Sequence, residues 1–158
     1  MEGGYEMNFV QIFEWSDKFL SGHTGMDLTH REFVSMVEAL RSCPDWEIPG
    51  RLGELLTHCA DHFSDEQQLM ELHDFPATEC HVNEHAAVHR SIAEVMTMTD
   101  KASQAEVARR LADQLAHWFG MHLTYLDSAL AHWVVKRTHG GIPVVIRRDI
   151  PFAVQALD

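Results

Sequence analysis

Apolar residues recur every three or four positions along most of the chain, the spacing that places them on one face of an α-helix. The pattern breaks at Pro44, at Pro76 and near Asp100, and it ends near Lys136. It therefore predicts four helices joined by short connections. Such helices pack most simply as an up-down-up-down bundle, so we expect an all-α four-helix bundle without a sheet.

Local signals predict where each helix begins. Asp27 is a candidate N-cap for the first helix, and Pro49 suits the first turn of the second. Pro76 can open the third helix, while Ser103 and Glu106 have the spacing of a capping box at the start of the fourth.

Both ends of the chain lack the helical period. Residues 1–26 mix glycines with aromatic residues and are predicted to form an N-terminal arm packed on the bundle, which spans residues 27–137. Residues 138–158 contain the segments IPVVI and IPFAV and are predicted to form an extended C-terminal tail. The tail either covers exposed bundle surface or contacts another subunit, so a homo-oligomer formed through it is possible.

Composition excludes several function classes. The formal net charge is −12 and basic residues form no long cluster, which argues against nucleic acid and anionic membranes as partners. The three cysteines have no CxxC spacing, so neither a disulfide framework nor a thiolate zinc site is indicated. No uncharged run is long enough to span a membrane and the acidic N-terminal residues do not resemble a signal peptide, so we expect a cytoplasmic protein.

Twelve histidines are the unusual feature of the composition. Side chains four residues apart on a helix share a face and can reach one ion. Every predicted helix offers candidates at or near this spacing: Asp27 and His30; His58, His62 and Glu66; His81, His85 and His89; His117, His122, Asp127 and His132. One such pair alone is weak support for a metal site. In a bundle, however, inward-facing side chains from four helices meet around one axis, and burying imidazoles and carboxylates there without an ion would cost free energy. The full set of candidates therefore favours a metal site.

Helical phase separates some of these candidates. His62 shares the apolar stripe of Leu55 and Cys59, and His122 shares that of Leu111 and Leu115, so both are predicted to face inward. His58 lies one turn from His62, and phase alone leaves it open. For His89, His117, His132 and His139, a solvated face is the favoured interpretation.

The set of donors indicates which ions fit. Five imidazoles with two carboxylates suit two first-row transition ions, and iron is the natural candidate. A structural zinc site would use thiolates, and magnesium or calcium would favour oxygen ligands. The chain has no ExxH sequence, which ferritin-like di-iron proteins carry on paired helices.

Four segments together resemble the bacterial branch of the hemerythrin family. In chain order they are FEWSDKFLSGHTGMDLTH, HFSDEQQLM, FPATECHVNEH and WFGMHLTYLD, and the resemblance runs from about Phe13 to about Trp133. It implies a non-haem di-iron centre in a four-helix bundle. One iron would be held by three histidines, the other by two, and two carboxylates would bridge them with an oxo or hydroxo group: His81, His85 and His122; His30 and His62; Glu66 and Asp127.

Asp127 enters this set through the resemblance alone. In a regular α-helix a step of five residues turns Asp127 about 140° away from His122. The helical spacing that pairs His62 with Glu66 and His81 with His85 therefore does not predict it.

The resemblance also implies a function. We expect a protein that binds dioxygen reversibly for storage, delivery or sensing and is not an enzyme. Two alternatives stay open: a di-iron enzyme acting on peroxide or nitric oxide, and an iron- or zinc-handling protein without oxygen chemistry.

Overall fold

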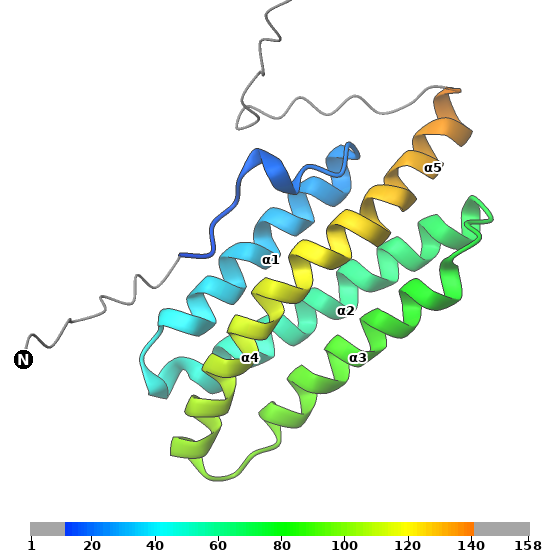
Figure 1. The fold of residues 1–158 in the computed structure, drawn as a ribbon. Helices are drawn as coiled ribbons and strands as arrows, with labels where there is room; N and C mark the ends of the chain where they lie inside the picture. Colours follow the sequence, from blue (N-terminus) through cyan, green and yellow to red (C-terminus); the bar gives the residue numbers. More distant parts are fainter. Residues whose placement is uncertain (1–11, 141–158) are drawn as a thin grey trace, which may run out of the picture.

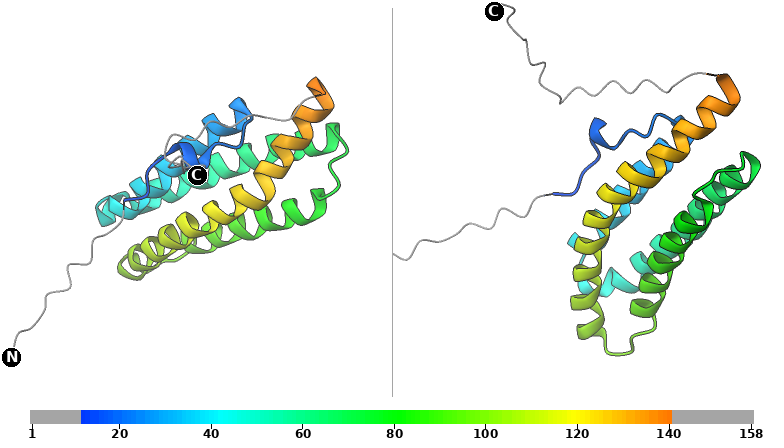
Figure 2. Two further views of the ribbon diagram at one scale, coloured as in Figure 1. Left: turned by 45° about the horizontal axis from the view of Figure 1, so that its top comes forward. Right: turned by 45° about the vertical axis from the view of Figure 1, so that its right-hand side comes forward.

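Each stretch of helical periodicity in the sequence forms a helix in the computed structural model, which describes residues 12–140 (Figure 1). The helices are α1 (Thr24–Ser42), α2 (Ile48–Leu72), α3 (Thr78–Met96), α4 (Lys101–His122) and α5 (Ser128–His139). A π-helical turn at Leu123–Asp127 joins α4 to α5, and Figure 2 shows the three as one long rod. No strand occurs within residues 12–140, so the predicted all-α four-helix bundle is confirmed.

The bundle has four rods: α1, α2, α3, and α4 continued by α5. Neighbouring rods run in opposite directions, and each packs against two others (Figure 1). Each helix buries one face, as its apolar period predicts. Within the described residues, no helix combines the length and the apolar character needed to cross a membrane.

The apolar core consists of two clusters. The larger lies toward the α1–α2 and α3–α4 connections and includes Val37, Leu55 and Ile92. The smaller lies toward the α2–α3 connection and includes Met26, Met70 and Leu130. On α1, α2 and α4 through α5, the buried histidines and carboxylates fall in sequence between members of the two clusters, so the bundle holds a polar layer between two apolar ones.

The described part of the N-terminal arm lies across α1 and α4. The rings of Phe13 and Phe19 meet Phe119 of α4, with centroids 6.0 and 5.2 Å away. The backbone N–H of Phe13 donates to Glu38 Oε2 of α1 at 3.1 Å. The predicted C-terminal tail, with its possible contact to another subunit, lies outside the described residues from position 141 onward.

The predicted N-cap of the first helix, Asp27, was wrong by four residues. His23 is the N-cap, because its Nδ1 accepts a hydrogen bond from the backbone N–H of Met26 at 3.3 Å. Asp27 lies inside α1, and its Oδ1 accepts from both the backbone N–H and the hydroxyl of Ser21 at 2.7 Å. Asp27 therefore attaches the arm to the helix.

The predicted capping box of the fourth helix was also wrong. Asp100 is the N-cap of α4, and its carboxylate accepts from the backbone N–H of Ser103 at 3.0 Å. Glu106, the other half of the predicted box, pairs with Arg110 at 2.9 Å. The helix therefore begins at Lys101, three residues earlier than a cap at Ser103 would give.

Gln104 of α4 stabilises the end of α3. Its side-chain N–H groups donate to the carbonyls of Val95 (3.0 Å) and Met96 (3.2 Å), in the last turn of α3, where carbonyls have no partner within the helix. We expect Gln104→Ala to destabilise the metal-free protein by about 2 kcal/mol, because a buried side-chain amide and its two bonds to the end of α3 are lost. Urea unfolding measures the change.

Gln114→Ala is the matched control, since Gln114 is exposed on the same helix. Its effect is expected to stay within about 0.5 kcal/mol. Equal unfolding free energies for the two variants would contradict the role given to Gln104.

Candidate metal centre

The polar layer of the bundle contains all seven residues that the sequence singled out as metal ligands. They come from every rod: His30 on α1, His62 and Glu66 on α2, His81 and His85 on α3, His122 on α4 and Asp127 at the end of the π-helical turn. All are at most 6 % exposed. Donor atoms of Glu66, His81, His85, His122 and Asp127 form one close group, and those of His30, His62 and Glu66 form a second, so Glu66 belongs to both.

The two carboxylates divide the five imidazoles into two groups. Glu66 Oε1 lies 3.3 Å from Nε2 of both His30 and His62, while Oε2 lies 3.3 Å from Nε2 of both His81 and His85. One carboxylate thus presents one oxygen to each group.

Asp127 repeats this division from the other side. Its Oδ2 lies 3.2 Å from His30 Nε2, and its Oδ1 lies 3.1 Å from Nε2 of His81 and of His122. The cluster is therefore two sets of nitrogen donors, one of two histidines and one of three, with a carboxylate oxygen from Glu66 and one from Asp127 beside each.

The spacing of these atoms fits a coordinated cation. Within the three-histidine group, His122 Nε2 lies 3.1 Å from His81 Nε2 and 3.0 Å from His85 Nε2. Ligands at about 2.1 Å from one ion and at right angles to each other stand about 3.0 Å apart. In the described structure none of the four carboxylate oxygens has a hydrogen-bond partner, which is costly for buried groups unless a cation binds them.

The π-helical turn explains how Asp127 reaches the cluster. Its backbone bonds span five residues, as in the bond from Ser128 N–H to Leu123 O, so the turn takes up one residue more than an α-helical turn. Asp127, five residues after His122, consequently returns to the same face of the rod. The regular helix assumed from the sequence was wrong at this point.

Charge within the cluster shifts the protonation of its imidazoles. Burial alone would lower the pKa of His30 and His81, but the carboxylates of Asp127 and Glu66 outweigh it and raise the two pKa values to about 10 and about 9. Burial dominates at His62 and lowers its pKa to about 4. In the metal-free protein, the raised values contribute stability that is complete below the ordinary value of 6.5 and is lost as pH rises through about 9 to 10.

These shifts predict proton release on metal binding. His30 and His81 are protonated at pH 7.5, and a cation binds only the unprotonated imidazole, so loading with zinc should release about two protons per chain. Calorimetry in buffers with different ionisation enthalpies measures the number. The release should decline as the starting pH approaches 10; an absence of release at pH 7.5 would contradict the assigned protonation.

Aromatic rings enclose the cluster on several sides. Phe63 stacks on His85 with ring centres 3.9 Å apart, Phe119 meets His30 edge-on at 5.4 Å, and Trp118 stacks on His122 at 4.4 Å. Apolar rings next to the imidazoles keep water away from their Nε2 atoms and fix their orientation.

A cavity of about 410 Å³ reaches the two-histidine group from outside. His62 and Glu66 line its inner end, and Met26, Leu69 and Leu72 contribute apolar walls. A small molecule entering between α1 and α2 therefore arrives at the side of the cluster that has fewer nitrogen donors.

The other histidines do not belong to the cluster. His58, which phase left open, lies outside both groups; its Nδ1 is 3.7 Å from the exposed Glu32. His117, His132 and His139 are exposed, as predicted, whereas His89 is half-buried.

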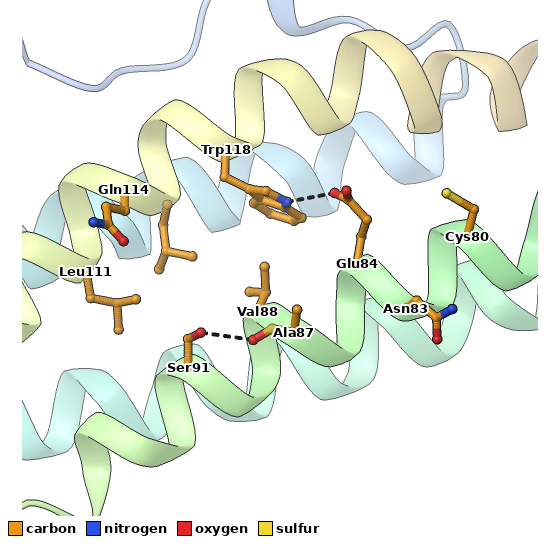
Figure 3. Close-up of a pocket in the computed structure, with 10 residues that line it drawn as sticks. Cys80, Asn83, Glu84, Ala87, Val88, Ser91, Leu111, Gln114 and Trp118 are labelled. Carbon is orange, nitrogen blue, oxygen red and sulfur yellow. Dashed lines mark hydrogen bonds between the residues drawn. The ribbon is translucent and has the colours of Figure 1, made fainter.

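Sequence reasoning missed Glu84, which bonds to Trp118 (Figure 3) and contacts His122 from outside the cluster. Glu84 Oε2 accepts from Trp118 Nε1 at 3.0 Å and lies 3.3 Å from His122 Nδ1. The indole N–H and then the imidazole of His122 hold the pKa of Glu84 below its usual range. The position of Glu84 directly before His85 was the available signal, but it does not show a contact with another helix.

Comparisons with known proteins agree with this geometry. Residues 21–134 match the family model described as the hemerythrin HHE cation binding domain. A bacteriohemerythrin from Ralstonia nicotianae is 29% identical over 81% of this chain and 93% of its own length. One from Aquifex aeolicus is 30% identical over 70% of this chain and 88% of its own length. No solved structure matches the chain significantly.

Proposed function

Because this chain belongs to the hemerythrin family, we propose that its buried cluster holds two non-haem iron ions and that the loaded protein binds dioxygen reversibly. The observation that carries the proposal is the division of Glu66 and Asp127, each with one oxygen beside either set of histidines. A carboxylate placed in this way bridges two ions.

Each ion has its own residues in this proposal. His81, His85 and His122 would hold one ion, His30 and His62 would hold the other, and Glu66 and Asp127 would contribute to both. Five imidazoles without a thiolate favour iron over structural zinc and over magnesium. A pair of iron ions supplies the two electrons that dioxygen takes up on binding and returns on release.

The two sides of the cluster differ in a way that suits a small ligand. The group of two histidines offers one nitrogen fewer than the group of three, and the cavity that ends at His62 and Glu66 leads to it. The apolar side chains of Met26 and Leu69 line the path and disfavour ions and bulk water, whereas an uncharged diatomic molecule passes without losing hydration.

Reversible binding also requires that water be kept away from the ions, and the aromatic rings around the cluster are placed to do this. Phe63, Phe119 and Trp118 cover three of the imidazoles and would keep water away from them when the site is loaded.

The test is an absorption spectrum of the iron-loaded protein cycled between deoxygenated and aerated buffer, with iron measured per chain. We expect two irons per chain and a visible band that appears with air and disappears without it. Turnover of peroxide or nitric oxide far above that of free iron would instead establish an enzyme. Metal binding with neither response would leave a metal-handling protein and would refute the oxygen proposal.

A further inference from the structure

Glu84 links two side chains of α4 through one oxygen. Glu84 lies on α3, and its Oε2 accepts from the indole N–H of Trp118 at 3.0 Å (Figure 3). The same oxygen accepts from Nδ1 of His122 at 3.3 Å. Glu84 is 45 % exposed, whereas the side chain of His122 is 2 % exposed. A carboxylate at the surface thus contacts the outer nitrogen of a buried imidazole.

This contact distinguishes His122 from other histidines of the cluster. In the described structure, the outer nitrogens of His30, His81 and His85 have no hydrogen-bond partner. A carboxylate beside Nδ1 keeps the proton on that nitrogen, so the lone pair of His122 stays on Nε2, which faces His81, His85 and Asp127.

Trp118 constrains the same pair in two ways. Its ring stacks on His122 with centres 4.4 Å apart and planes at 29°, which fixes the plane of the imidazole. Its N–H holds Glu84 in place at the edge of that plane. Without this bond the carboxylate would be free to turn into the groove between α3 and α4, which Glu84 and Trp118 line and which has a volume of about 540 Å³.

We propose that Glu84, held by Trp118, is the positioning residue for His122 and strengthens the binding of a cation by the three-histidine group. This proposal depends on the proposed function in one respect, which is that the cluster binds two cations. The negative charge next to Nδ1–H makes the imidazole a better donor, and the fixed ring plane removes the need to reorient it when the cation binds. The competing explanation is that Glu84 and Trp118 merely join α3 to α4.

The test uses the full chain, zinc as the probe and a competing chromogenic chelator that resolves two dissociation constants. Glu84→Gln keeps the size and removes the charge. Glu94→Gln makes the same change at an exposed position of α3 that is ten residues away. We expect Glu84→Gln to weaken one of the two zinc sites about tenfold and the other by less than about twofold, with Glu94→Gln unchanged.

Trp118→Phe and the double variant test whether Trp118 acts through Glu84. Trp118→Phe keeps an aromatic ring over His122 and removes the N–H. If Trp118 acts by holding Glu84, the double variant binds zinc no more weakly than Glu84→Gln alone, whereas independent effects would multiply. Nitrogen-15 spectra of the zinc-loaded imidazoles should show a change at His122 Nδ1 in Glu84→Gln and none in Glu94→Gln.

The outcomes separate the two explanations. Equal weakening of both zinc sites together with a lower unfolding midpoint of the metal-free Glu84→Gln variant would indicate a structural contact and overturn the proposal. Unchanged zinc binding in Glu84→Gln would overturn it as well. A wild-type chain that takes up fewer than two zinc ions would count against the paired cation site itself, which distinguishes that failure from this one.

Discussion

Glu66→Ala is expected to leave the chain unable to hold either of the two cations. Glu66 Oε1 lies 3.3 Å from both nitrogens of the two-histidine group, and Oε2 lies 3.3 Å from two nitrogens of the three-histidine group. Removing the carboxylate would therefore take one ligand from each ion and leave two cations close together with only the charge of Asp127 between the two groups. Iron per chain, measured after anaerobic loading and desalting, should fall from two to near zero.

Glu71→Ala provides the control for this variant. Glu71 is an exposed residue of α2 that pairs with Gln67, and it loses the same carboxylate on the same helix. It should retain both irons and the oxygen-dependent band. Retention of two irons by Glu66→Ala would mean that the central carboxylate of the cluster is not shared, and the paired site would be refuted.

His122→Ala is expected to lose iron and to abolish the oxygen-dependent spectrum. His122 is the one histidine that α4 contributes to the cluster, and its Nε2 lies 3.0 to 3.1 Å from His81, His85 and Asp127. Without it the three-histidine group has the same number of nitrogens as its neighbour. Elemental analysis and the aerobic difference spectrum measure both effects.

His132→Ala is the matched substitution on the same rod. His132 is exposed on α5, so neither iron content nor spectrum should change. Normal oxygen binding with two irons in the His122 variant would overturn the ligand assignment, because the site would then not depend on α4.

The helices could be predicted because the face that each one buries in the bundle is the face on which its apolar residues recur. The first residue of a helix could not be predicted in this way. His23 is a weak N-cap by propensity, and it caps α1 because Asp27, the stronger candidate, bonds to Ser21 of the arm. At α4, Asp100 and Ser103 both have the chemistry of a cap. Only the three-dimensional course of the α3–α4 connection decides between them.

Only part of the candidate site could likewise be predicted from the spacing of residues along the sequence. The pairs His62 with Glu66 and His81 with His85 follow from a spacing of four residues on regular helices. Asp127 follows no such rule, since it depends on the π-helical turn, and the resemblance to a family was needed to find it. The contact of Glu84 with His122 joins residues 38 positions apart on two helices, which no local pattern indicates.

The π-helical turn also makes the length of the fourth rod matter to the cluster. One surplus residue is accommodated between Leu123 and Asp127, so losing an exposed residue there, such as Thr124, would return the rod to regular α-helix with Asp127 four positions after His122. Anywhere else along α4 the same loss would rotate all later side chains by about 100° and turn Leu130 and Val134 out of the core. This short stretch is thus the place where the rod can change length and keep its inward face.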